Sequence, residues 1–165
     1  MNTKINPCKV VTGTEVKWNY VNMLEPKAFG SSAPKYSVQL IIPKTDIATV
    51  TAIQKAILAA YEEGRDKIGG NDVVTPPIDA IHTPLRDGDE EHPDSEQYRG
   101  CYFMNASNKS KPKFVDKDKH PITSVPNIGS FNGASGKAAL TMFAYNFNGN
   151  AGIACRLDGL QMYQS

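Results

Sequence analysis

The stretch from residue 99 to residue 119, RGCYFMNASNKSKPKFVDKDK, places aromatic rings next to closely spaced lysines. In a strand, alternate side chains point to opposite faces, so Tyr102 and Met104 share one face and Phe103 lies on the other. The face with Tyr102 is the more apolar, and we therefore expect Tyr102 in the core and Phe103 exposed, in line with Lys109. An exposed ring beside ammonium groups can stack on a nucleic-acid base while the cations pair with phosphates. A strand followed by a solvated lysine-rich turn fits the same pattern, because isolated aromatic side chains are common on protein surfaces.

The segment from 136 to 147, GKAALTMFAYNF, repeats this combination of rings and polar residues. In a strand, Phe143, Tyr145 and Phe147 fall on one face, opposite Leu140. Both faces of a strand can be covered in a twisted barrel, so the pattern leaves open which one is exposed. Each exposed ring could contribute about 1–3 kcal/mol per stacked base.

No arrangement of residues predicts catalysis. The segment 129–137, GSFNGASGK, invites comparison with a phosphate-binding loop, but Phe131 stands where that pattern needs glycine and Ala138 where it needs serine or threonine. The histidines lack metal-ligand spacing, and no serine or cysteine lies in a nucleophile elbow. The acidic run 87–91 beside His92 could attract Mg²⁺ or Ca²⁺, but a solvated acidic loop is the simpler interpretation. We expect no cofactor, no metal and no enzymatic activity.

The charges of the 165-residue chain are segregated, although its formal net charge is only +1. Residues 1–60 and 101–165 each carry +4, whereas residues 61–100 carry −7. Three cysteines without a CxxC pair disfavour a disulfide framework and a zinc site, and neither a signal peptide nor a membrane-spanning run is found. We therefore expect a single cytoplasmic domain over residues 1–165, with a mildly basic body and an acidic loop excursion at about 69–98.

Hydrophobic periodicity predicts a mainly β chain with one main α-helix. A long strand over residues 9–20 would point Trp18 and Tyr20 inward. Further strands are expected over 35–42, 112–115, 136–147 and 151–164, with a turn at Asn148–Asn150 and a bulge at Gly159. A loop is expected over 22–34, where Lys27 is again paired with Phe29. The helix would be capped by Thr45 or Asp46 and end at Gly64.

Several stretches resemble a family of phage and prophage single-stranded-DNA-binding proteins that was formerly a domain of unknown function. They are VTGTEVKWNYVNMLEPKAFG (11–30), PKYSVQLIIPKTD (34–46), TPLRDGDEEHPD (83–94), GCYFMNASNKSKPKFVD (100–116) and FAYNFNGNAGIACRLDGLQ (143–161). The family is similar in fold to the OB-fold single-stranded-DNA-binding proteins of short-tailed phages. The resemblance implies an OB-fold-like, five-stranded Greek-key barrel with long inserted loops. It also implies non-catalytic, sequence-independent binding of single-stranded DNA in phage DNA replication or recombination.

Face assignment and clustering predict two groups of nucleic-acid-binding side chains. Aromatic rings would stack on bases, and lysine and arginine side chains would meet phosphates. The predicted rings are Phe103, Phe143, Tyr145 and Phe147, and the predicted cations are Lys17, Lys35, Arg99, Lys109, Lys111 and Lys113.

The expected partners are single-stranded DNA and phage or host replication proteins, without a membrane. Homodimerisation and the choice between DNA and RNA stay open. Many such replication proteins end in an acidic tail that contacts partners, whereas this chain ends in GLQMYQS, so the acidic run 87–96 could contact partners or mask the binding surface instead. The alternatives are a protein-interaction or virion component with the same β body, and a metal-dependent nuclease or nucleotide hydrolase that uses the acids of 87–96.

Overall fold

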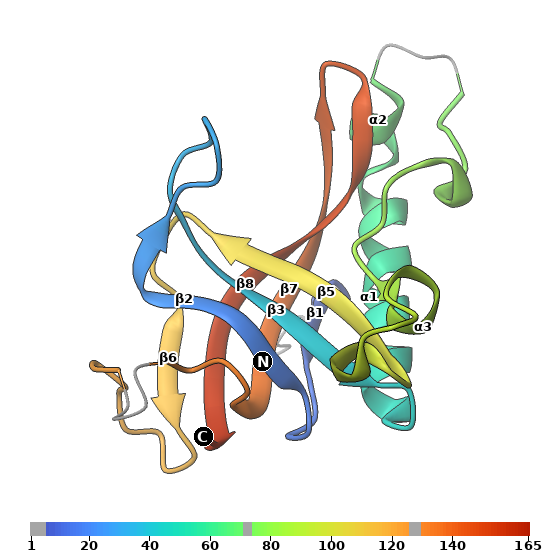
Figure 1. Cartoon of the computed structure of the whole chain (residues 1–165). Coiled ribbons are helices and arrows are strands. Elements are labelled where there is room, and N and C mark those ends of the chain that lie inside the picture. The colour runs from blue at the N-terminus through green and yellow to red at the C-terminus, as the bar shows by residue number, and fades with distance from the viewer. Residues whose placement is uncertain (1–5, 71–73, 126–129) are drawn as a thin grey trace, which may run out of the picture.

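Eight strands and three α-helices make up the fold in the computed structural model, which describes residues 6–70, 74–125 and 130–165 (Figure 1). The strands are β1 (Lys9–Val11), β2 (Lys17–Lys27), β3 (Lys35–Pro43), β4 (Arg86–Asp87), β5 (Cys101–Asn108), β6 (Lys113–Asp116), β7 (Ser135–Phe147) and β8 (Asn150–Gln164). The helices are α1 (Ile47–Glu63), α2 (Arg65–Gly69) and α3 (Gly88–Glu91), with two 3₁₀ turns, η1 (Ile78–Ala80) and η2 (Glu96–Tyr98).

Five of the strands form a closed circuit. β2 pairs with β3, β3 with β5, β5 with β8, β8 with β7, and β7 returns to β2 through Lys17 and Ser135. The β5–β8 pairing is parallel and the others are antiparallel. In chain order this ring reads 1-2-3-5-4, the arrangement of a five-stranded Greek-key barrel of the OB type. The prediction of a mainly β, OB-fold-like chain is confirmed.

The prediction of one strand over 9–20 is wrong, because the chain breaks between β1 and β2. The Thr12 hydroxyl accepts a hydrogen bond from the Ala138 amide, and the Gly13 amide donates to the Thr49 hydroxyl in α1. A side chain at Gly13 would lie 2.7 Å from an Asp46 carboxylate oxygen. The small residue therefore lets the chain cross the start of α1 before β2 begins.

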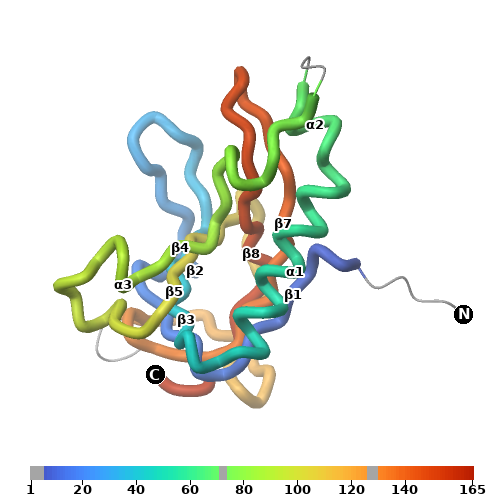
Figure 2. The backbone as a smooth tube through the Cα atoms, turned by 90° about the vertical axis from the view of Figure 1, so that its right-hand side faces the viewer, coloured from blue at the N-terminus to red at the C-terminus, as the bar shows by residue number. Residues whose placement is uncertain are grey.

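Helix α1 forms where its sequence predicts it and packs beside β1 and β7 (Figure 2). The Asp46 carboxylate caps it by accepting a hydrogen bond from the Thr49 amide. Its apolar stripe joins the main core, which lies between the helix and the inner faces of the barrel strands. Gly64 ends the helix where a Cβ atom would lie 2.2 Å from Ala144 Cβ. None of the described helices is both long and apolar enough to cross a membrane.

The β7–β8 hairpin settles which face of β7 is exposed. Leu140 and Met142 are buried in the main core, whereas Phe143 is 43 % and Phe147 75 % exposed. The hairpin closes through Asn148 and Gly149, both with positive φ, as the Asn-Gly signal predicts. The expected bulge is also present, because the register skips Asp158 just before Gly159.

Candidate nucleic-acid interface

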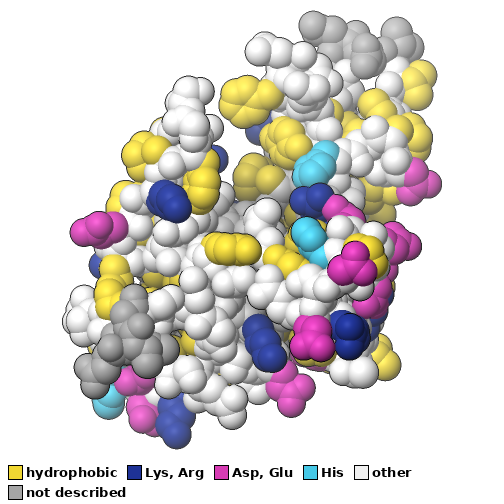
Figure 3. All heavy atoms as spheres, in the orientation of Figure 1, with side chains coloured by type: hydrophobic (Ala, Val, Ile, Leu, Met, Phe, Trp, Pro, Cys, Tyr) yellow, Lys and Arg dark blue, Asp and Glu magenta, His cyan; other side chains and the backbone are white. Residues whose placement is uncertain are grey.

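The outer face of β3 and β5 carries two adjoining hollows that share Asn105 and Ser107. The larger, about 460 Å³, lies against the hairpin formed by β2 and β3, which we call the arm (residues 20–37). The smaller, about 240 Å³, reaches Tyr145 of the β7–β8 hairpin. Figure 3 shows the surface hollowed between these two projections. We call the combined depression the groove.

The floor of the larger hollow is polar and uncharged, whereas Arg86 borders the smaller one. Ser37 lies opposite Ser107 and Gln39 opposite Asn105 in the β3–β5 ladder, and these side chains line the larger hollow. Strand alternation sends their neighbours Met104 and Ala106 into the main core. The floor can therefore offer hydrogen bonds to many different bases without selecting one by charge.

The arm supplies exposed rings and cations. Tyr20 is 57 % and Phe29 56 % exposed, and both line the larger hollow. The Lys27 ammonium lies 5.4 Å from the Phe29 ring centroid. Lys27 and Lys35 stand directly opposite each other in the β2–β3 ladder, where like charges repel. An anion placed between them would relieve that repulsion, so the arm suits a phosphate next to a stacked base.

Tyr20 points outward, against the expectation that it joins Trp18 in the core. The β2–β3 register shifts between Asn19 and Asn22, and Tyr20 itself has a φ of 51°. A bulge of this kind breaks the alternation that places every second side chain inside. Because the positive φ falls on a tyrosine, which rarely adopts it, no residue type in the sequence marked this bulge. Trp18, in contrast, is fully buried and does not line the groove.

The β7–β8 hairpin provides the opposite wall. Tyr145 lies opposite Gly152 in the ladder and lines the smaller hollow. Phe143 and Phe147 project from the same face of β7. The three predicted rings of this strand are thus brought together at the groove wall or next to it.

Phe103 faces away from the main core, as expected, but it is not exposed. Its side chain is only 2 % exposed because residues 86–98, which we call the acidic insert, fold back over the outer face of β5. Tyr98 packs edge-on against the Phe103 ring at 5.1 Å, and the Arg86 guanidinium lies 5.1 Å above it. Tyr102 is half-buried and packs against the main core. The predicted face is confirmed, and the predicted exposure of Phe103 is wrong.

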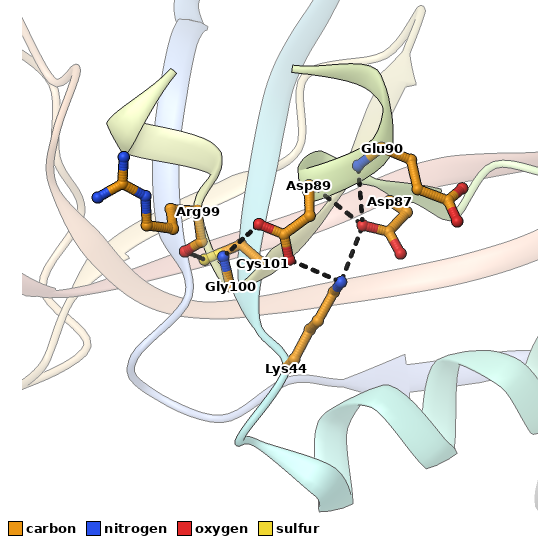
Figure 4. Close-up of polar contacts among 7 residues, drawn as sticks. All are labelled: Lys44, Asp87, Asp89, Glu90, Arg99, Gly100 and Cys101. Carbon is orange, nitrogen blue, oxygen red and sulfur yellow. Dashed lines mark hydrogen bonds and ion pairs between the residues drawn. The ribbon is translucent and has the colours of Figure 1, made fainter. Parts of the chain in front are cut away.

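Polar contacts fasten the insert to the barrel (Figure 4). The Lys44 ammonium lies 2.8 Å from carboxylate oxygens of both Asp87 and Asp89. Asp89 also accepts a 2.9 Å hydrogen bond from the Gly100 amide. The Lys44 contact is the main cause that lowers the pKa of both carboxyl groups, and the two carboxylates raise the pKa of Lys44. We call Lys44, Asp87 and Asp89 the latch.

A second set of contacts seals the insert against the groove floor. The Tyr98 hydroxyl donates a 2.6 Å hydrogen bond to the Gln39 side-chain oxygen, and burial raises the pKa of Tyr98. His92 stacks on Tyr98 with 4.3 Å between ring centroids. Arg86 pairs with Glu91. The acidic run is therefore a folded cover on β3 and β5 that is anchored by paired acids, while most of its carboxylates stay exposed to solvent, as its composition predicts.

The predicted cations are divided among three places. Lys35 lines the groove, and Lys109 and Lys111 are exposed in the connection that leaves β5 near Lys35. Lys17 lies opposite Ile41, which packs with Phe103 under the insert, and Arg99 lies 4.0 Å from Glu96. Lys113 lies on β6, outside the groove. Phe29 lines the groove as well, and Lys27 lies beside its ring, although only their pairing of charge with ring marked them in the sequence.

One group of side chains within the described residues has metal-ligand geometry. Asp116, Asp118 and His120 bring their ligand atoms within 4.8 Å of one another in the turn after β6. Hydrogen bonds from the backbone amides of His120 and Asp118 help to lower the pKa of Asp116. Exposed carboxylates of this kind can hold a hard cation weakly. The cluster lies outside the groove and has no part in the site.

A model of the protein family described as Enterobacter phage Enc34, ssDNA-binding protein, matches residues 8–165 of the chain. The chain is also similar to protein p50 of Acyrthosiphon pisum secondary endosymbiont phage 1. The two are 28% identical over 160 residues, which cover 91% of this chain and 83% of p50.

Solved structures of phage proteins share the fold. The single-stranded DNA-binding protein from bacteriophage Enc34 with a C-terminal truncation superposes with a TM-score of 0.77 at 15% identity, covering 99% of this chain and 93% of its own. The same protein in complex with ssDNA gives 0.73 at 17% identity, with 99% and 94% covered. The gp2.5 single-stranded DNA binding protein encoded by bacteriophage T7 gives 0.64 at 18% identity, with 94% and 91% covered.

Proposed function

The chain belongs to the family of the Enterobacter phage Enc34 single-stranded-DNA-binding protein, and from that premise we propose that it binds single-stranded DNA in the groove. One observation carries the proposal: aromatic rings, exposed at the arm and half-buried at Tyr145, stand on both walls of a floor of polar side chains, and cations gather at the arm. In OB folds the second and third barrel strands, with the loops at their ends, form the nucleic-acid surface. Here those strands are β3 and β5, and the arm and the β7–β8 hairpin are those loops.

The division of labour follows from the side chains. Tyr20, Phe29 and Tyr145 would stack on bases, with Phe143 and Phe147 extending the hairpin wall. Lys27, Lys35, Lys109 and Lys111 would pair with phosphates. A base can stack on these rings only when its face is free, which a duplex does not allow, so the site favours a single strand. Ring faces and phosphates are common to all nucleotides, so binding should ignore base sequence.

The proposed role is non-catalytic coating of DNA strands during phage replication or recombination, in the cytoplasm of the host cell. The contacts of the insert support this over a metal-dependent hydrolase. Asp87 and Asp89 both bind Lys44, and Glu91 binds Arg86, so these acids are committed to holding the insert in place. If the protein bound only other proteins, the rings on the two groove walls would have no evident function.

A titration of fluorescent oligo-dT, followed by polarisation with and without Mg²⁺, tests the proposal. We expect binding without Mg²⁺, no cleavage on a denaturing gel with Mg²⁺, and similar affinity for oligo-dA and oligo-dC. Unlabelled duplex of equal length should compete poorly. Equal competition by duplex, or no binding to any strand, would refute the proposal.

A further inference from the structure

The end of the groove at Ser107 leads directly to a second exposed surface. Ser107 lies beside Arg156 in the parallel β5–β8 pairing, and Lys113 lies beside Gly159 in the parallel β6–β8 pairing. Residues 107–113 therefore follow the outer edge of β8 over three of its residues, about 10 Å of strand. The Asn108 side chain fixes this course, because it donates to the Leu157 carbonyl and accepts from the Ser110 amide.

Lysines line this route and gather at its end. Lys109 and Lys111 are exposed along it. Beyond it, Lys113, Lys119 and Lys137 surround a shallow hollow of about 220 Å³ on the outer face of β1, β6, β7 and β8. We call these five lysines and that hollow the lysine track. Val11, which is 66 % exposed, also lines the hollow.

The cations of the lysine track are free to meet an anion. Within the described residues, none of the five lysines has a carboxylate partner within 4 Å. Two acids next to the track, Asp158 and Asp116, are already engaged. Asp158 binds Arg156 and the Thr141 hydroxyl, and Asp116 accepts hydrogen bonds from the amides of its own turn.

The track differs from the groove in its ring content. Tyr163 is its aromatic neighbour, and the Lys137 ammonium lies 5.8 Å from that ring. The surface therefore offers ammonium groups without the paired ring walls that stack bases. Such a surface suits the phosphates of a strand whose bases are turned away.

We propose that a single strand longer than the groove leaves it past Ser107 and continues over the lysine track, held there by its phosphates. This inference rests on the proposed function and adds to it a second, electrostatic segment of the site. It predicts that affinity grows with strand length beyond what the groove holds, and that this gain is especially sensitive to salt.

The test compares two strand lengths and two charge-matched variants. Oligo-dT of about 6 and about 30 nucleotides brackets the roughly 4–16 nucleotides that OB folds cover. The dye-labelled protein is titrated with excess oligonucleotide, so that each strand carries at most one protein, and affinity is read by thermophoresis over a salt series. The variants are K113A/K137A on the track and K55A/K67A on α1 and α2, which remove the same charge.

For the 30-mer, K113A/K137A should reduce the slope of log affinity against log salt by about 1.4. Each lysine–phosphate contact on a single strand contributes about 0.7 to that slope, and the variant removes two such contacts. The affinity of the 6-mer for K113A/K137A should equal its affinity for wild type. K55A/K67A should leave the affinity for both strand lengths unchanged, and K113R/K137R should restore the salt slope of the 30-mer. If K113A/K137A still bound the 30-mer more tightly than the 6-mer by the same factor as wild type, the proposal that DNA contacts the lysine track would be refuted.

The same variants separate the two proposals and the main rival occupant. If wild type bound neither strand length, both the groove and the lysine track would be excluded as DNA-binding surfaces. If the 6-mer bound normally and K113A/K137A left the 30-mer slope unchanged, only the lysine track would be excluded. If K113A/K137A abolished self-association in light scattering while leaving the 30-mer slope intact, the lysines would serve contact between copies, which also overturns a DNA path.

Discussion

The arm and the acidic insert, at opposite ends of the β3–β5 ladder, use the same kinds of side chain for opposite purposes. At the arm, rings and lysines are exposed, and no carboxylate within the described residues pairs with Lys27 or Lys35. At the acidic insert, an arginine and three rings pack on one another, and the cations are paired with acids. An aromatic–basic cluster is therefore a binding surface where nothing covers it and a small core where an insert does.

The largest expected difference between the ends is in stability. Phe103→Ala removes a ring that is buried between β5 and the insert, which typically costs about 3–5 kcal/mol of unfolding free energy. Phe147→Ala removes a ring that is 75 % exposed and should change stability by less than about 0.5 kcal/mol. Urea unfolding followed by the fluorescence of buried Trp18 measures both. A Phe103→Ala protein as stable as wild type would mean that the insert does not pack on this ring.

Loss of a ring at the groove walls should act mainly on binding. Phe29→Ala and Tyr145→Ala should each weaken oligo-dT binding by about 1–3 kcal/mol, or roughly 5- to 150-fold, because each removes one stacking platform. Phe29→Tyr keeps the ring and should retain affinity. Leu58→Ala, an exposed apolar residue on α1, is the matched control. Unchanged affinity in both ring variants would remove the groove walls from the site.

The comparison also shows what the sequence could predict. The barrel strands, α1 and the hairpin turn follow from periodicity, a capping aspartate and an Asn-Gly pair, all of which are local signals. Alternation also placed Phe103 on the outer face correctly. It could not show that residues 86–98 return to cover that face, because this depends on contacts such as Lys44 with Asp87 and Tyr98 with Gln39, which join segments far apart in the chain.

Tyr20 illustrates the second limit. A single bulge reverses the faces of all later residues in a strand, and periodicity averaged over β2 cannot detect it. The lysines show a third limit. Lys109, Lys111 and Lys113 are evenly spaced in sequence, yet the chain between β5 and β6 runs from the groove along β8, so that Lys113 lies outside the groove. Spacing predicted that they cluster, but not on which surface.

The negative charge of the acidic insert should weaken oligo-dT binding modestly, through long-range repulsion of the DNA phosphates. Glu90 and Asp94 are exposed, and no ion pair within the described residues includes them. Glu90→Gln with Asp94→Asn should tighten oligo-dT binding a few-fold at low salt, with the gain fading as salt shortens the screening length to about 8 Å. Glu62→Gln with Asp66→Asn makes the same charge change on α1 and α2 and should have less effect. Equal tightening by both pairs would show that only net charge matters.

Deletion of residues 86–96 tests the stronger form of the same idea. It removes the negative charge and also uncovers Phe103, so it should tighten binding at low salt more than the two neutral substitutions do. The covered end would then resemble the arm. Unchanged affinity after deletion would show that the insert does not mask the surface.

The smallest expected effect is the release of the latch. Because Lys44 lowers the pKa of Asp87 and Asp89 below 3.8, the contribution of the latch to stability is complete above pH 3.8 and is lost as pH falls through the lowered values. The pKa of Lys44 is raised above 10.5, so the lysine stays charged at neutral pH. The Gly100 amide, which donates to Asp89, reports this in a proton–nitrogen correlation spectrum. In Lys44→Gln the titration midpoint that the Gly100 amide reports should move up towards 3.8, with little change in global stability because the latch is partly exposed. An identical midpoint in both proteins would mean that the Gly100 amide alone holds Asp89, and that the insert stays closed through its rings and not through its charges.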